Sequence, residues 1–268
     1  MISTGGNNLF VTGTAGTALG IPVSGSFGLA GYSTSAADAA RRSTLNQLLT
    51  LDNATDLTHA AENVMAGALA CSAALNPILK ATTGAAAARF AGLTTNFAQQ
   101  LLAVAKVIEA RAQFGVQRQV FLVTLGSFDT HINQLKQQQT LFSQLDAGLT
   151  AFHGAMSDIG AADEVTSFTL SDFARTYAPN TTGGSDHAWG SHHLVAGGAV
   201  KGGKLYGAVP TLELGGPDDV GDEGRWIPTI AVDQYAATLA TWFGVSATQL
   251  AAVLPNLSAF PKTSIGFV

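Results

Sequence analysis

The chain is poor in cysteine and in charged side chains. Cys71 is the one cysteine among 268 residues, which excludes an internal disulfide and any metal site built from several thiolates. Its Ala-rich surroundings predict an inert position inside a helix. Charged residues make up 12% of the chain, about half the usual share. Ser, Thr, Asn, Gln and Gly must therefore carry much of the water-facing surface, as is typical of secreted or periplasmic proteins.

Positive charge is especially scarce, and long apolar runs are missing. The 13 Lys and Arg residues are outnumbered by 18 Asp and Glu residues, giving a net charge of −5. No basic stripe occurs that would favour a nucleic-acid partner. No apolar run approaches the roughly 20 residues that span a bilayer, so membrane insertion is not expected. We expect a soluble globular protein. No pattern in the sequence defines its oligomeric state.

The pattern of apolar residues predicts one α/β domain over residues 1–268, with three parts. A β-rich segment covers 1–34, a helical segment covers 35–115, and an α/β core covers 116–268. Helical spacing is found at 35–51, 58–80, 94–114, 134–159, 232–244 and 246–254. Runs of strand-forming residues are found within 8–31 and at 119–126, 164–171 and 192–200. Ser35 and Ser246 are expected N-caps, and Gly115 and Gly244 expected C-caps.

The strand at 119–126, the helix at 134–159 and the strand at 164–171 predict a βαβ unit with parallel, buried strands. Each strand runs into polar residues: Asp129 and His131 follow the first, and Asp172 and Arg175 the second. Ligands of open α/β sheets bind at the carboxyl ends of strands. We therefore expect Asp129, His131 and Asp172 along one rim of the sheet.

The loop GGSDHAWGSHH, residues 183–193, holds three of the six histidines of the chain. Its glycines at 183, 184 and 190 would let the backbone approach other segments closely. Asp and His side chains together are ligands for zinc or manganese. Folding of this loop over the rim would therefore create a metal site. The loop contributes Asp186, His187, His192 and His193.

Structural roles compete with this interpretation. Asp129 could instead cap the helix that follows it. Asp172 could likewise cap a helix or pair with Arg175. His192 and His193 would face opposite sides of one strand, so at most one would point inward. An acidic cluster in a Gly/Pro loop could bind calcium or be solvated: Asp218, Asp219, Asp222 and Glu223. The chain contains neither a G-x-S-x-G elbow nor a phosphate loop.

Four stretches in this order resemble the bacterial family called domain of unknown function 1501: VFLVTLGSFDTH, TLSDFARTYAPN, GGSDHAWGSHHLVAGGAVKGGKLYG and RWIPTIAVDQYAATLATWFGV. That family is grouped with the alkaline-phosphatase-like superfamily, which includes sulfatases. The resemblance implies a three-layer α/β/α fold with a mostly parallel sheet and a metal site at its rim. It also implies the metal ligands Asp129, His131, Asp172 and His187. Asp186, His192 and His193 would be outer or spare ligands.

The sequence departs from the superfamily pattern at two places. Phe173 stands where a histidine is usual, which weakens a second metal site. Members of the family also usually carry a twin-arginine export signal and a first strand with a nucleophilic Ser or Thr. Neither is found here, so the resemblance implies the C-terminal part of a longer periplasmic or secreted protein. Its nucleophile would lie upstream of residue 1.

Together these observations predict a metal-dependent hydrolase of phosphate or sulfate esters. Zinc, manganese or calcium would be the cofactor, and an anionic small molecule or polysaccharide ester the substrate. Arg175 would orient Asp172 or bind the anionic group. The alternative is a non-catalytic exported binding or assembly protein of the cell envelope that retains the fold.

Overall fold

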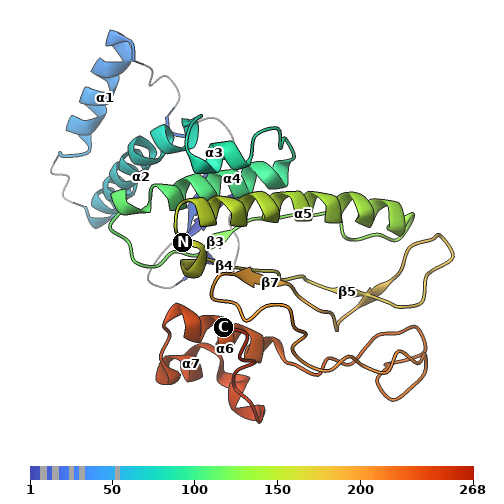
Figure 1. Cartoon of the computed structure of the whole chain (residues 1–268). Helices are drawn as coiled ribbons and strands as arrows, with labels where there is room; N and C mark the ends of the chain where they lie inside the picture. Colours follow the sequence, from blue (N-terminus) through green and yellow to red (C-terminus); the bar gives the residue numbers. More distant parts are fainter. Residues whose placement is uncertain (7–10, 14–17, 24–26, 30–33, 52–54) are drawn as a thin grey trace. The chain divides into compact units, whose positions relative to one another are not determined.

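The computed structural model describes residues 1–6, 11–13, 18–23, 27–29, 34–51 and 55–268 (Figure 1). The chain forms two compact units. The first consists of residues 1–124 and 147–155, and the second of residues 125–146 and 156–268. It is a mixed α/β protein with small sheets. Part of the predicted β-segment at 8–31 lies outside the described residues.

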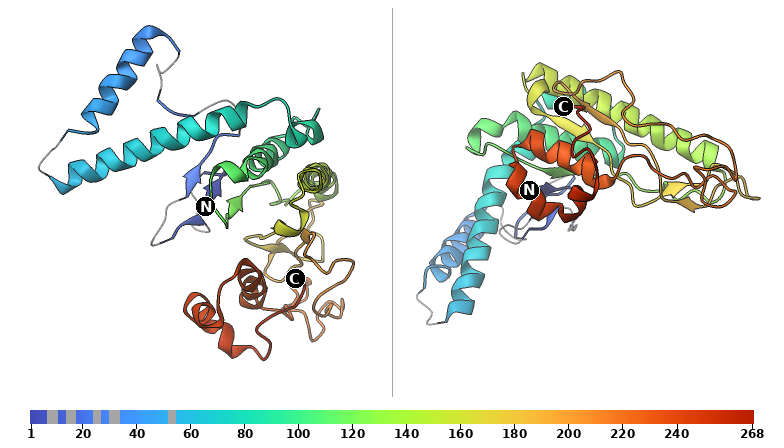
Figure 2. Two further views of the ribbon diagram at one scale, coloured as in Figure 1. Left: turned by 60° about the vertical axis from the view of Figure 1, so that its left-hand side comes forward. Right: turned by 90° about the horizontal axis from the view of Figure 1, so that it is seen from below.

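The first unit contains a small parallel sheet. Strand β1 (Ile2–Ser3) lies between β2 (Leu19–Gly20) and β3 (Phe121–Leu122), and both pairings are parallel. Its helices are α1 (Ala36–Leu48), α2 (Asp56–Lys80), α3 (Ala85–Arg89) and α4 (Asn96–Glu109), followed by a 3-10 turn at Arg111–Gln113. Figure 2 shows the long α2 and the neighbouring α4 from two further sides.

The core of this unit joins the sheet to two helices. Ile2 and Ile21 pack with Leu75 of α2 and with Ala103 and Val107 of α4. The predicted helical spacing therefore does place one face of α4 inside the protein.

The expected N-cap at Ser35 is confirmed, because its side chain accepts a hydrogen bond from the Asp38 amide. The strand predicted at 119–126 is wrong in extent and burial, because β3 covers two residues that are only half-buried.

A buried amide connects the ends of strands β1 and β3. The Gln100 side chain is 2% exposed. Its Oε1 accepts hydrogen bonds from Thr4 Oγ1 (3.0 Å) and the Thr124 amide (2.8 Å). Its Nε2 donates to Asn96 Oδ1 (2.7 Å) and to the Thr124 carbonyl (2.8 Å). All four hydrogen bonds of the amide group are therefore made inside the protein.

Replacing Gln100 with leucine should destabilise the protein by about 2 kcal/mol, since buried partners of the amide lose their hydrogen bonds. Urea denaturation of wild type and Q100L measures the effect. Gln117 is exposed, so Q117L is the matched control and should change the midpoint little. Equal midpoints for Q100L and wild type would show that the network contributes nothing to stability.

The second unit combines helices with two short hairpin-like sheets. Helix α5 (Gln134–Asp158) contributes residues to both units. A 3-10 turn at Ala162–Glu164 precedes β4 (Thr166–Phe168), which pairs antiparallel with β7 (Val195–Gly197). Strand β5 (Ala174–Arg175) pairs antiparallel with β6 (His187–Ala188). Helices α6 (Val232–Phe243) and α7 (Ala247–Val253), with a last 3-10 turn at Pro255–Ala259, pack around Ala237, Leu250 and Leu257.

The predicted βαβ unit is wrong in its pairing, although its elements exist. Helix α5 matches the expected helix at 134–159. Strand β3, however, pairs with β1, whereas β4 pairs with β7 in a separate sheet and runs antiparallel to it.

The ends of two helices agree with the sequence prediction: Gly244 closes α6 in the left-handed conformation, and Ser246 caps α7. Among the described residues, no helix has the length and apolar character to cross a membrane.

Candidate metal centre

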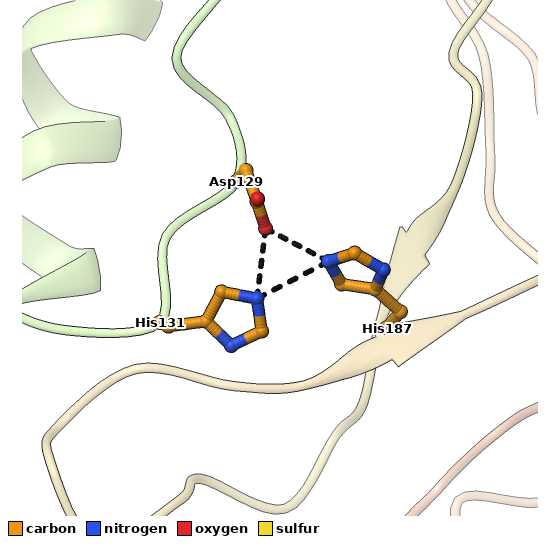
Figure 3. Close-up of side chains that lie close together, drawn as sticks. All are labelled: Asp129, His131 and His187. Carbon is orange, nitrogen blue, oxygen red and sulfur yellow. Dashed lines mark hydrogen bonds and ion pairs between the residues drawn. The ribbon is translucent and has the colours of Figure 1, made fainter.

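Three side chains of the second unit meet at one point (Figure 3). Asp129 Oδ1 lies 2.9 Å from His131 Nε2 and 2.8 Å from His187 Nε2. The two imidazole Nε2 atoms lie 3.2 Å apart. We call Asp129, His131 and His187 the triad. Each of its side chains is about half exposed, between 45% and 56%, so water and solutes reach it directly.

Backbone hydrogen bonds bring the two chain segments of the triad together. The Ser185 amide donates to the Thr130 carbonyl (3.3 Å), and the Gln134 amide donates to the Gly183 carbonyl (3.0 Å). The His131 carbonyl accepts from Asn180 Nδ2 (2.9 Å) and Thr182 Oγ1 (2.5 Å). The loop before His187 is therefore fastened to the segment that carries Asp129 and His131.

Two of the glycines singled out in the sequence stand where backbones touch. A Cβ atom on Gly184 would lie 2.1 Å from the His131 carbonyl carbon. One on Gly190 would lie 2.2 Å from the Trp226 carbonyl oxygen. No side chain fits at such distances. The expectation that glycine permits close approach is confirmed at both positions, whereas Gly183 serves instead through its positive φ of 73°.

The hairpin of β5 and β6 supports His187. Arg175 and His187 are direct cross-strand neighbours. The Phe173 ring stacks on the His187 imidazole, with centroids 4.1 Å apart and an interplanar angle of 8°. Sequence reasoning gave Phe173 no role. The available signal was its spacing, since residues 173 and 175 point to one side of an extended strand.

Arg175 connects the hairpin to Asp129. Its Nη1 lies 2.9 Å from Asp129 Oδ1. Its Nε donates to Ser185 Oγ (3.2 Å) and its Nη2 to the Ser185 carbonyl. Its Cζ lies 5.7 Å from the Phe173 ring centre. The side chain is 12% exposed. Arg175 therefore orients Asp129, a contact that was not predicted.

A further carboxylate orients His131. Asp186 Oδ1 lies 3.2 Å from His131 Nδ1, on the ring nitrogen that points away from Asp129. A carboxylate at this nitrogen fixes the tautomer that leaves Nε2 with a free lone pair. Asp186 was predicted to be an outer residue of the metal site, and the structure gives it the corresponding contact.

The surroundings of Asp129 favour its ionised form. The hydrogen bond from His187, followed by that from Arg175 and the nearby charge of His131, lowers the pKa of Asp129 below its ordinary value. Partial removal from water opposes this effect but does not reverse it. The carboxylate is therefore charged at neutral pH, as a metal ligand must be.

Other predicted ligands lie outside the triad. Among the described residues, the triad is the one group with the geometry to hold a metal ion, and it does not include Asp172, His192 or His193. Asp172 and His192 are exposed. His193 stacks on Tyr235, with ring centres 5.6 Å apart, and partial burial lowers its pKa. Both histidines precede β7 and are not part of it.

The acidic loop has a structural arrangement. Asp219 Oδ2 accepts hydrogen bonds from the amides of Gly215 (3.0 Å) and Gly224 (2.9 Å), and its Oδ1 from the amide of Arg225 (2.8 Å). Asp218 Oδ2 accepts from the amide and hydroxyl of Thr211, both at 2.8 Å. These carboxylates organise the loop itself. Arg225 Nε then donates to the His187 carbonyl at 3.3 Å.

Comparison with known proteins gives a family without a known function. Residues 29–222 match the model of a family described as "Protein of unknown function (DUF1501)". No curated protein matches the chain. No solved structure matches it.

Proposed function

We propose that this chain, which belongs to the DUF1501 family of unknown function, is a metal-dependent hydrolase of phosphate or sulfate esters. Its geometry supports the metal, and its resemblance to the alkaline-phosphatase-like superfamily supports the ester. The observation that carries this proposal is the convergence of Asp129, His131 and His187 on one point. These residues come from segments 58 positions apart in the chain. The ring nitrogen and carboxylate oxygen atoms that face one another are the atoms that bind metals.

The donor set of the triad suits a small divalent cation. Two imidazoles and one carboxylate are typical ligands of zinc or manganese, whereas calcium prefers oxygen ligands throughout. The distances between the three donor atoms are 2.8, 2.9 and 3.2 Å. Bonds of about 2.1 Å place neighbouring ligand atoms about 3.4 Å apart around a tetrahedral zinc ion, so the three side chains would move slightly apart on binding. The donor set makes zinc or manganese the proposed cofactor, in preference to calcium.

Each residue around the centre has a defined task in this proposal. Asp129, His131 and His187 hold the cation, which polarises an ester oxygen when bound. Asp186 keeps His131 in the tautomer with Nε2 free. Arg175 supplies a positive charge beside Asp129 and fixes the carboxylate through its bond of 2.9 Å. The half-exposed triad leaves room for an anionic small molecule or a polysaccharide ester.

The proposal also includes a superfamily, a fold and a location. We place the chain in the alkaline-phosphatase-like superfamily, with a three-layer α/β/α fold and a periplasmic or secreted location. The small parallel sheet of the first unit is compatible with this placement.

Phe173 favours a second candidate, a non-catalytic exported binding or assembly protein of the envelope that retains the fold. The ring at this position offers no lone pair, and it stacks on His187 instead. A two-metal centre would need a ligand there. This candidate predicts no turnover, with or without a bound cation.

The proposal is tested by metal content and by ester hydrolysis of the same preparations. We expect near-stoichiometric zinc or manganese in wild type by mass spectrometry, and its loss in His187→Ala. His192→Ala is the matched control, since His192 is an exposed histidine outside the triad. Hydrolysis of p-nitrophenyl phosphate or sulfate by wild type, abolished in His187→Ala, would support the enzyme. Metal without turnover would support the non-catalytic candidate, and metal-free folded protein would overturn the metal-dependent hydrolase in favour of that candidate.

A further inference from the structure

The two histidines of the triad differ in how their rings are held. His131 Nδ1 has Asp186 as a partner at 3.2 Å. Among the described residues, His187 Nδ1 has no hydrogen-bond partner. Metal-binding histidines usually use their second nitrogen for such a bond, which fixes the orientation of the ring. His187 Nε2 does contact Asp129 Oδ1 at 2.8 Å, but Nε2 is the atom that would bind the cation, so another contact must orient the ring.

The backbone alone is a weak support for this ring. Strand β6 contains two residues, and its partner β5 also contains two. The His187 side chain is 50% exposed, so little packing limits the rotation of its side-chain torsions. An exposed histidine with no partner on Nδ1 would sample several rotamers. Most of them would point Nε2 away from Asp129.

Phe173 provides the missing support. Its ring lies nearly parallel to the imidazole, at 8° and 4.1 Å between centres. Coplanar stacking restricts both the position and the tilt of the imidazole. Phe173 is itself placed beside Arg175, whose Cζ lies 5.7 Å from the ring centre and whose Nη1 binds Asp129. One aromatic ring thus contacts one ligand of the triad, His187, and the arginine that positions a second ligand, Asp129.

We propose that Phe173 is a positioning residue of the metal centre, which holds the His187 imidazole with Nε2 directed at Asp129 before a cation binds. The inference rests on the proposed metal-binding function. In it, the stacked ring replaces the carboxylate or carbonyl that normally orients a metal-binding histidine. A ring held in this way loses less rotational freedom when the ion arrives, so the ion binds more tightly.

The test compares zinc binding by titration calorimetry in wild type, Phe173→Leu, Phe173→Met and Phe173→Tyr. Loss of an outer partner of a metal ligand costs about 10- to 100-fold in affinity. We expect about a tenfold loss in the leucine and methionine variants, which stay apolar but lack a ring. The tyrosine variant should bind like wild type. Phe168→Leu is the matched control, because Phe168 contacts Tyr235 and lies outside the triad.

A second measurement needs no metal. In the metal-free protein, proton NMR should show the His187 ring protons shifted upfield by the Phe173 ring, and this shift should vanish in Phe173→Leu. Unchanged zinc affinity in the leucine and methionine variants would overturn the role of Phe173 while leaving the metal site intact. A wild type that binds no zinc or manganese would overturn the proposed function, and the inference with it.

Discussion

Replacing Asp129 with asparagine should weaken zinc or manganese binding by at least about 100-fold, beyond the range for outer partners of metal ligands. Asp129 Oδ1 is the atom shared by the whole centre: His131, His187 and Arg175 all contact it. Asparagine keeps the shape but removes the negative charge that a divalent cation requires. Titration calorimetry on the chelator-treated proteins measures the change.

The fold should survive this substitution, because Asp129 is 56% exposed and lies outside the core. Asp222→Asn is the matched control, since Asp222 is an exposed carboxylate of the same unit outside the triad. We expect wild-type affinity in the control and similar unfolding midpoints in all three proteins. Equal cation affinity in Asp129→Asn and wild type would remove Asp129 from the site.

Replacing Gly184 with alanine should separate the two halves of the triad. The new Cβ would lie 2.1 Å from the His131 carbonyl carbon and 2.3 Å from the His131 carbonyl oxygen. Both are backbone atoms and cannot turn aside as a flexible side chain would. We expect a loss of stability of about 3 kcal/mol, the upper end for overpacked sites. Cation affinity should fall in parallel, because His187 moves away from Asp129.

Thermal unfolding and zinc titration of G184A check this result. Gly126→Ala is the matched control: it lies three positions before Asp129, and a Cβ there meets no atom within 4 Å. A stable G184A protein with unchanged zinc affinity would mean that the loop tolerates displacement and that its close approach is not needed for the site.

The two chain segments that form the triad were predictable because each is marked by a local pattern in the sequence. Asp129 and His131 follow a run of strand-forming residues. His187 lies in a loop whose glycines indicate close contacts between backbone segments. The structure agrees at Gly184 and Gly190, because a Cβ atom at either position would lie about 2 Å from a backbone carbonyl group. Residue type and glycine content thus indicated the two chain segments before any pairing of strands was known, whereas the choice of His187 within the loop came from the family resemblance.

The remaining ligand assignments depended on long-range pairing, which local patterns do not encode. Asp172 was placed on the rim because β3 and β4 were assumed to be neighbours, and each instead pairs with another strand. The same error hid the pairing of Arg175 with His187 across β5 and β6. Phe173 was noted only as a departure from the superfamily pattern, because its residue type gives no sign that it stacks on an imidazole.

Three helix ends were predicted correctly from the sequence, whereas the burial of a strand was not. The caps at Ser35 and Ser246 and the end at Gly244 follow from single residues and were predicted correctly. The strand at 119–126 was expected to be buried on both faces because it is continuously apolar. Its two paired residues are half-buried, because burial depends on how many strands and helices assemble around it.

The separation of the triad along the chain has a consequence for how the protein loses its structure. Asp129 and His187 are 58 positions apart, so an ion bound by both would act as a reversible cross-link around the intervening segment. Because such an ion is held by the folded geometry and released on unfolding, its binding stabilises the native state. At a free-ion concentration 100 times the dissociation constant, the native protein would gain about 2.7 kcal/mol. Proteases would then cut the 180–190 loop more slowly as the ion concentration rises.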